Sequence, residues 1–348
     1  MASESAIFIK RKTKDMEKQK VTIYDVAHKA QVSMATVSRV VNGNSNVKPL
    51  TRKKVLKVIK HLNYQPNAVA RGLASKRTTT VGVITPNVAD TYFSELALGI
   101  DDIAAMYKYN IILANSDDNG KKEIHVLNTL LTKQVDGIIF MGNEITDDLR
   151  KHFRKAKTPI VLAGSIDSQK TEPSVNINYR QATEDEVNHL IERGNKHIAF
   201  ITGSLNQAIN SKYRLVGYQN ALKNHHLNYD PKLVFPTNRS YQDGYDLSKR
   251  LIKMDVSAAM VSNDELAAGV MNGLTDAGIK VPDQFEIATS DDTKLTKMTR
   301  PTMTSITQPL YDIGAVAMRL LTKIMNKDKV NSHDVLLPYG LIKRNSTK

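Results

Sequence analysis

The chain has 348 residues, of which 41% are hydrophobic and 24% charged, a composition typical of a folded protein with two or three domains. It contains no cysteine, which excludes disulfides, thiolate metal ligands and a cysteine nucleophile. No apolar run approaches the roughly 20 residues that cross a bilayer, and the apolar stretch within residues 1–20 is too short for a signal peptide. We therefore expect a soluble cytoplasmic protein in which residues 1–20 form a disordered or extra N-terminal arm.

The net charge of +14 is concentrated at the start of the chain. Residues 1–80 contain 17 Lys and Arg against 4 Asp and Glu, whereas the remaining residues contain 32 against 31. A basic block joined to a neutral body indicates a unit that binds a polyanion, attached to a core with another role. Charge alone leaves a solvated basic tail as the alternative.

Residues 21–65 carry the pattern of three short helices, with turn residues between them. A tight turn separates the first two helices, as in a helix-turn-helix unit. Thr22 and Ser33 are suitable N-caps for these two helices. The second helix would turn outward short side chains and one arginine, a face suited to base edges in a major groove. These outward residues are Met34, Ala35, Thr36, Ser38 and Arg39. The alternative, a three-helix bundle that binds nothing, is disfavoured by the basic composition.

Residues 66–78 form a separate segment, which we predict to be a hinge helix and linker. Pro66 can start a helix, but the Ala-rich segment is too short to be a stable helix alone in water. It would become helical on docking, with Arg71 and Lys76 near phosphates. Leu73 could wedge between base pairs in the minor groove, or it could pack against a second copy of the chain.

From residue 79 onward, apolar strands alternate with amphipathic helices, a pattern typical of parallel sheets covered on both faces. Seven βα units exceed what one open sheet usually holds, so we expect an α/β core of two parallel-sheet lobes. Ligands of such folds bind at the carboxyl ends of the strands, in the crevice between lobes. The predicted strands are 81–85, 111–115, 135–141, 160–164, 198–203, 258–262 and 285–289. The predicted helices are 93–107, 123–133, 180–193, 212–224 and 265–277.

No catalytic or metal motif is present: the sequence has no GxGxxG, GxxxxGK[ST], GxSxG or HExxH, and its nine His are scattered. We therefore predict a protein that is not an enzyme and has no cofactor. Asp264 follows a predicted strand directly, where it could bind a ligand in the crevice or cap a helix.

A late amphipathic helix, Tyr311–Asn326, places Arg319 and Lys323 one turn apart on its polar side with no acid nearby. Like charges at this spacing repel by a few tenths of a kcal/mol. The residues alone leave two interpretations open, a solvated face or a docking site for an anion, and favour the first.

Two long motifs resemble the LacI/GalR family of repressors. Val21–Ala27 and Val32–Asn42 resemble the family's helix-turn-helix head, and Tyr64 with Pro66–Leu73 resembles its hinge helix. The resemblance runs from residue 21 to residue 348. It implies a core like the type I periplasmic binding proteins, and a homodimer on a pseudo-palindromic operator of double-stranded DNA. Further DNA contacts, in the head and through the hinge, would come from Thr22, Tyr24, Ser33, Asn46, Arg52, Lys53, Lys54, Asn67, Ala70, Leu73 and Lys76.

Within the family, segments 106–113, 133–141 and 311–323 most resemble regulators of carbon catabolite repression in low-GC Gram-positive bacteria. In those regulators the effector is a protein, the phosphocarrier HPr phosphorylated on a serine, or its paralogue. The resemblance implies that Arg319 and Lys323 hold the phosphoserine, so the anion site becomes the preferred interpretation. The residues around it would be Tyr311, Asp312, Tyr107 and Asp117.

The resemblance also divides the core into an N-lobe, about 79–178 and 308–332, and a C-lobe, about 179–307 and 333–348. The chain departs from the family pattern at Asn87, where an acid is expected, and at Thr289-Ser290-Asp291-Asp292, which replaces Gly-Phe-Asp-Asn. Tyr339-Gly340 replaces His-Arg. The last two departures leave open whether sugar phosphates bind the crevice as helper ligands near Asp264 and Asp291. The alternative function is a repressor controlled by a small sugar or nucleobase in that crevice. A sugar-binding transport protein shares the fold, but the basic head argues against it.

Overall fold

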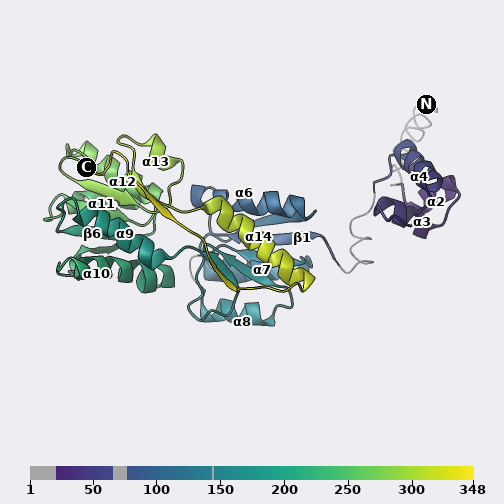
Figure 1. Cartoon of the computed structure of the whole chain (residues 1–348), viewed down its shortest axis with the longest axis horizontal. Coiled ribbons are helices and arrows are strands. Elements are labelled where there is room, and N and C mark those ends of the chain that lie inside the picture. The colour runs from purple at the N-terminus through teal and green to yellow at the C-terminus, as the bar shows by residue number, and fades with distance from the viewer. Residues whose placement is uncertain (1–20, 66–76, 143–144) are drawn as a thin grey trace, which may run out of the picture. The chain divides into compact units, whose positions relative to one another are not determined.

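The computed structural model describes residues 21–65, 77–142 and 145–348. The chain forms two compact units, Met1–Thr78 and Thr79–Lys348, which are described here one at a time (Figure 1). Their boundary coincides with the predicted start of the core at residue 79. Among the described residues, no helix combines the length and the apolar character needed to cross a membrane.

The first unit contains the three predicted helices, α2 (Ile23–Ala30), α3 (Met34–Val41) and α4 (Pro49–Leu62). Each buries the apolar side of its helical repeat. Proline at the first position of α4 fits because its missing N–H would have no partner inside the helix. The shared core of the three helices is made of Val26, Ala27, Ala30, Val37, Val40, Val47, Val55 and Tyr64.

The second unit contains two six-stranded sheets. In the first, the N-lobe sheet, all paired strands are parallel and the order is β11-β5-β4-β3-β1-β2. The strands are β1 (Thr80–Thr85), β2 (Asn110–Asn115), β3 (Gly137–Phe140), β4 (Ile160–Ala163), β5 (Ser174–Asn176) and β11 (Asp334–Leu336). One face packs on α6 (Thr91–Met106) and α14 (Leu310–Asn326), and the other on α7 (Gly120–Thr132) and α8 (Asp147–Lys155).

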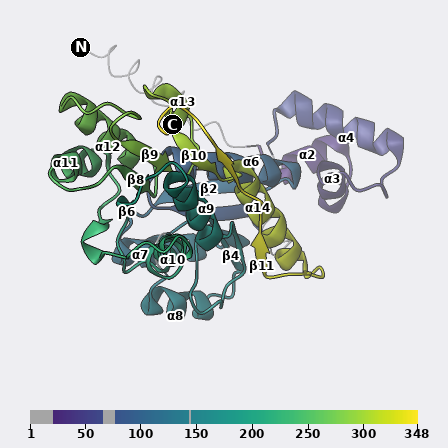
Figure 2. The same cartoon turned by 60° about the vertical axis from the view of Figure 1, so that its left-hand side comes forward.

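The second sheet, of the C-lobe, has the order β12-β10-β9-β8-β6-β7, and only β12 runs antiparallel to its neighbour. Its strands are β6 (Ile198–Thr202), β7 (Val234–Pro236), β8 (Ala258–Val261), β9 (Glu286–Thr289), β10 (Thr304–Thr307) and β12 (Gly340–Ile342). Its helices are α9 (Tyr179–Ile191), α10 (Leu215–Asn224), α11 (Tyr241–Leu251), α12 (Asp264–Asp276) and the short α13 (Leu295–Met298). Figure 2 shows α11 and α12 on one side of β6 and β8, with α9 and α10 on the other.

All seven predicted strands are present, but the sequence analysis missed β5, β7, β10, β11 and β12. Four of these have only three residues, and β10 has polar residues at three of its four positions, so none of them stands out as an apolar run. One lobe boundary was wrong: residues after 332 were assigned to the C-lobe, whereas β11 pairs with β5 in the N-lobe sheet. The chain therefore returns to the C-lobe between β11 and β12.

Two glycines set the distance between α6 and α14, which lie side by side in Figure 1. A Cβ added to Gly99 would lie 2.0 Å from the Tyr311 carbonyl oxygen, and one added to Gly314 would lie 2.0 Å from that of Leu96. Only glycine allows backbones to approach this closely. This crossing fixes α14, the helix that carries the predicted anion site.

Candidate DNA-binding and effector sites

The second helix of the head, α3, presents the face that the sequence predicted. Ser33 caps it, because its hydroxyl accepts a hydrogen bond of 3.3 Å from the backbone N–H of Thr36. Met34, Ala35 and Arg39 are exposed, whereas Thr36 and Ser38 are partly buried. Buried Val37 and Val40 hold the opposite side on α2 and α4, so the exposed side is free to meet a groove.

Most of the predicted phosphate contacts lie at exposed positions of the head, but three of them already have partners. Thr22 forms a capping box with Asp25, whose carboxylate accepts 2.7 Å hydrogen bonds from the Thr22 backbone N–H and hydroxyl. The Arg52 guanidinium donates to the carbonyl oxygen of Asn44. The exposed Lys54 donates a 3.4 Å hydrogen bond from its ammonium group to the side-chain oxygen of Gln31. The remaining predicted phosphate contacts of the head, all exposed, are Tyr24, Asn46 and Lys53. The predicted hinge contacts Asn67, Ala70, Leu73 and Lys76 lie outside the described residues.

Helix α14 carries an exposed cationic pair. It buries Ile313, Ala317, Leu320 and Leu321, and Ile324 is partly buried. Arg319 and Lys323 are exposed on the other side, and neither side chain has a salt-bridge partner among the described residues. The uncompensated positive charge predicted from the sequence is therefore present at the surface.

Tyr311 and Asp312, also predicted for this site, are exposed in the first turn of α14. The Tyr311 hydroxyl donates a 2.8 Å hydrogen bond to Asp102 on α6, and this bond raises the pKa of Tyr311, while the charge of Arg319 lowers it. The hydrogen bond joins the two helices at the surface, about two turns of α14 before Arg319. Asp102 was not selected from the sequence, because an adjacent acid pair usually marks a solvated helix end.

Tyr107 and Asp117 do not lie together. Tyr107 is the C-cap of α6, just before β2, whereas Asp117 follows the other end of β2 and pairs with Lys122. A six-residue strand spans about 20 Å, so one phosphoserine cannot touch both side chains. They remain candidates for separate parts of a protein partner's contact area.

Both acids predicted for the crevice, Asp264 and Asp291, are buried. Asp264 is buried and accepts hydrogen bonds from the Thr289 hydroxyl (2.9 Å), the Thr293 backbone N–H (2.7 Å) and the Thr293 hydroxyl (2.8 Å). The helix-cap alternative for Asp264 was wrong, because Asn263 is the N-cap of α12. Burial raises the pKa of Asp264 to about 6, although the bonds from Thr293 and Thr289 act in the opposite direction.

Asp291 is also buried, beside two arginines that the sequence analysis missed. Its carboxylate accepts a 3.0 Å hydrogen bond from the Gln308 amide. Burial and the charge of Asp264 raise its pKa well above the usual range, whereas Arg214 and Arg239 act against this shift. Arg214 is itself buried, with its guanidinium 5.4 Å from the Tyr179 ring centre.

A third buried acid, Glu186, was also missed. Its carboxylate accepts a 2.7 Å hydrogen bond from the hydroxyl of Ser290, the residue that stands where the family pattern has Phe. In the sequence Glu186 directly follows two other acids, Glu184 and Asp185, on an ordinary amphipathic helix, so no local signal could reveal its burial. The departure at Ser290 was visible, but its partner was not.

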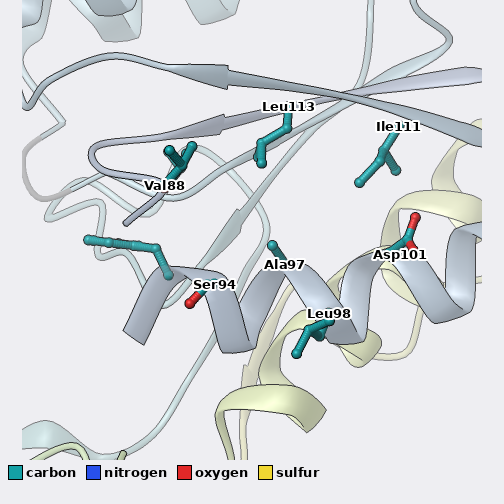
Figure 3. Close-up of a pocket in the computed structure, with 9 residues that line it drawn as sticks. Val88, Ser94, Ala97, Leu98, Asp101, Ile111 and Leu113 are labelled. Atoms are coloured by element: carbon teal, nitrogen blue, oxygen red, sulfur yellow. The ribbon is translucent and has the colours of Figure 1, made fainter. Parts of the chain in front are cut away.

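A shallow apolar pocket of about 270 Å³ lies between α6 and the edge strand β2. The lining residues include Leu98 on the helix, and Figure 3 shows Ala97 and Asp101 on the helix pointing toward Ile111 and Leu113 on the strand. Leu98 is 61% exposed and Leu113 44% exposed. Clustered exposed apolar side chains of this kind mark interaction surfaces. Among the described residues, no group of three or more His, Asp or Glu side chains could hold a metal ion.

Comparisons with known proteins agree with this geometry. Residues 22–67 match the family described as bacterial regulatory proteins, lacI family, and residues 187–347 match a periplasmic binding protein-like domain. The chain is 57% identical over 328 residues to catabolite control protein A of Streptococcus mutans, covering 94% of this chain and 98% of that protein. It is 53% identical over 330 residues to catabolite control protein A of Priestia megaterium, with 94% and 99% covered.

Two solved structures show the same architecture. Transcription regulator CcpA of Lactococcus lactis is 48% identical, with a TM-score of 0.76 over 78% of this chain and 100% of that chain. The lac repressor dimer bound to operator is 27% identical, with a TM-score of 0.86 over 94% of this chain and 99% of that chain. The chain therefore belongs to the lacI family of bacterial regulatory proteins, and it is a DNA-binding transcription regulator related to catabolite control protein A.

Proposed function

We propose that the protein regulates genes of carbon catabolite repression and activation from the cytoplasm, with serine-phosphorylated HPr as its corepressor. The observation that carries this proposal is the exposed cationic pair Arg319 and Lys323, which has no acidic partner among the described residues. A phosphoserine carries about −1.5 to −2 charges and three acceptor oxygens, the group that such a pair recognises. The similarity to relatives named catabolite control protein A supports this choice.

The proposed target is a pseudo-palindromic operator. Helix α3 of each copy would lie in the major groove, with Met34, Ala35 and Arg39 against base edges. Leu73 of each copy would open a deformable step in the minor groove between the two half-sites. Binding of phosphorylated HPr and of operator would be linked, so that each tightens the other.

A palindrome requires two copies, and the apolar surface around the α6–β2 pocket is the proposed contact between them. Leu98, Leu113 and Val88 are all exposed there, and β2 is an edge strand. A second copy would remove this surface from water. The lac repressor structure, solved as a dimer bound to operator, supports two copies on one operator.

The decisive test is the affinity for a labelled palindromic operator, measured at fixed salt with no HPr, with HPr and with serine-phosphorylated HPr. We expect tightening only with the phosphorylated form. The double variant Arg319→Ala, Lys323→Ala should lose this response and keep its basal operator binding. Lys329→Ala, an exposed lysine beyond the end of α14, is the matched control and should respond normally. A double variant that still responds would place the phosphoserine site elsewhere.

A second candidate is control by a small sugar or nucleobase in the crevice, which the buried Arg214 and Asp291 favour. Tight operator binding that is indifferent to HPr in both forms but changed by a small ligand would favour this function.

A further inference from the structure

The turn between α3 and α4, residues 42–46, is held by hydrogen bonds and not by burial. All five of its residues are exposed, and the first buried side chain after it is Val47. Gly43 has a φ of +73°, and a Cβ there would meet nothing within 4 Å, so glycine is needed for the backbone conformation alone. An exposed turn of this kind keeps one shape only if its polar groups have fixed partners.

Asn44 is bonded through three of its groups, and two of these bonds lie within the turn and α3. Its backbone N–H donates a 2.9 Å hydrogen bond to the carbonyl oxygen of Arg39, and the Gly43 N–H donates one of 3.2 Å to that of Val40. This pair of bonds is the Schellman motif that ends α3. The Asn44 side-chain oxygen accepts a 3.0 Å bond from the backbone N–H of Asn46. Asn44 therefore connects the last turn of α3 with the segment that carries Asn46, a predicted DNA contact.

The third group of Asn44, its carbonyl oxygen, accepts a hydrogen bond from the guanidinium group of Arg52 on α4. The donor is charged, and such bonds are about twice as strong as bonds between neutral groups. Arg52 is partly buried, whereas the neighbouring Lys53 and Lys54 are exposed. One turn further along, Val55 is 0% exposed and fixes α4 in the core of the head. Arg52 therefore ties the exposed turn to a helix that is held by burial.

We propose that Arg52 is a positioning residue, which acts through Asn44 to hold the end of α3 in the orientation that brings Arg39 to base edges. The residue pattern of the head predicts a phosphate contact for Arg52 instead. The two roles contribute differently, because a phosphate contact adds affinity for every DNA sequence, whereas a positioned α3 adds affinity only for the operator. The inference rests on the proposed recognition of the operator by α3.

The test compares the affinity of the full chain for the palindromic operator with its affinity for random DNA of the same length, each over a series of salt concentrations. We expect Arg52→Ala to weaken operator binding about tenfold, as the loss of one base contact does. Binding to random DNA should stay within about twofold of the wild type, with the same salt dependence. Loss of a phosphate contact would instead lower the slope of log affinity against log salt by about 0.9 on both DNAs.

Gly43→Ala is a second variant that disturbs the same turn without removing a charge, because alanine is strained at a φ of +73°. It should reproduce the loss of operator preference, and the double variant with Arg52→Ala should weaken operator binding by less than the two single effects combined. Lys57→Ala removes a positive charge from an exposed position of α4. It is the matched control and should keep the wild-type preference for the operator.

A lower salt slope in Arg52→Ala, equal losses on operator and random DNA, or fully independent effects of Arg52→Ala and Gly43→Ala would each overturn the proposal. Equal losses are also what a head with reduced stability would show, since such a head binds both DNAs less well. A wild type without preference for the operator would contradict the proposed function instead. In that case the salt slope of Arg52→Ala on random DNA would still decide between the two roles of Arg52.

Discussion

The contact between α6 and α14 gives a prediction whose size can be worked out from the structure. In Gly314→Ala the new methyl group would lie 2.0 Å from the Leu96 carbonyl oxygen and 2.9 Å from its carbon. Ordinary contact begins at 3.4 Å, so the helices must separate by about 1.4 Å at this point. The obstacle is backbone, which cannot turn aside as a side chain can.

The cost of this separation outweighs the gain in helix propensity. Alanine in place of glycine stabilises a helix interior by about 1 kcal/mol. Against this, a gap of 0.5–1 Å already forfeits about a quarter to a half of the dispersion attraction across it, and overpacking a core costs about 1–3 kcal/mol or more. We expect Gly314→Ala to lower the free energy of unfolding of the core by about 1–2 kcal/mol, the upper part of the overpacking cost less the gain in helix propensity. It should also weaken the response to phosphorylated HPr, because α14 carries Arg319 and Lys323.

Urea denaturation followed by circular dichroism measures the first effect, and operator titration measures the second. Gly120→Ala is the control, since a Cβ there meets nothing within 4 Å at the start of α7. Gly99→Ala should cost a similar amount, because its Cβ would strike the Tyr311 carbonyl oxygen from the other side of the same contact. The double variant should then cost less than the sum, since one separation makes room for both methyl groups. Full additivity, or a stable Gly314→Ala, would refute this account.

Three further predictions concern other parts of the molecule. Burial lowers the pKa of His189 to about 4, and the charges of Arg193 and Lys343 add to this shift. As the pH falls, the unfolded chain therefore binds a proton at this histidine at a higher pH than the folded chain does. The free energy of unfolding should decrease by up to about 3 kcal/mol between about pH 6.5 and pH 4. The measurement is the urea midpoint of the wild type and of His189→Gln at both pH values. An equal decrease of the midpoint in the two proteins would contradict the prediction. Leu98→Lys should shift the protein from dimer to monomer in sedimentation, because a charge would enter the proposed interface; an unchanged dimer would move the interface elsewhere. Leu73→Ala should weaken specific operator binding far more than nonspecific binding, as measured by competition with random DNA, and equal losses would exclude the wedge.

Long periodic segments made much of the fold predictable from the sequence. The three helices of the head and α14 repeat their apolar residues over enough turns to identify themselves, and seven of the strands are marked by short apolar runs. The same holds for the exposed side of α3 and for the cationic pair on α14. Both depend only on which side of one helix is apolar, and that is a local property of the chain.

Features that join distant segments were decided only by the tertiary structure. The short strand β11 joins the N-lobe sheet because β5, about 160 residues earlier, offers it an edge, and three residues cannot encode that choice. Tyr107 and Asp117 are ten positions apart in the sequence, yet a strand holds them at its two ends. Glu186, Arg214 and Asp291 come from three separate elements, and each alone looks like an ordinary surface charge. Their burial, and with it the chemistry of the crevice, follows from the packing of helices on a sheet, which no local pattern contains.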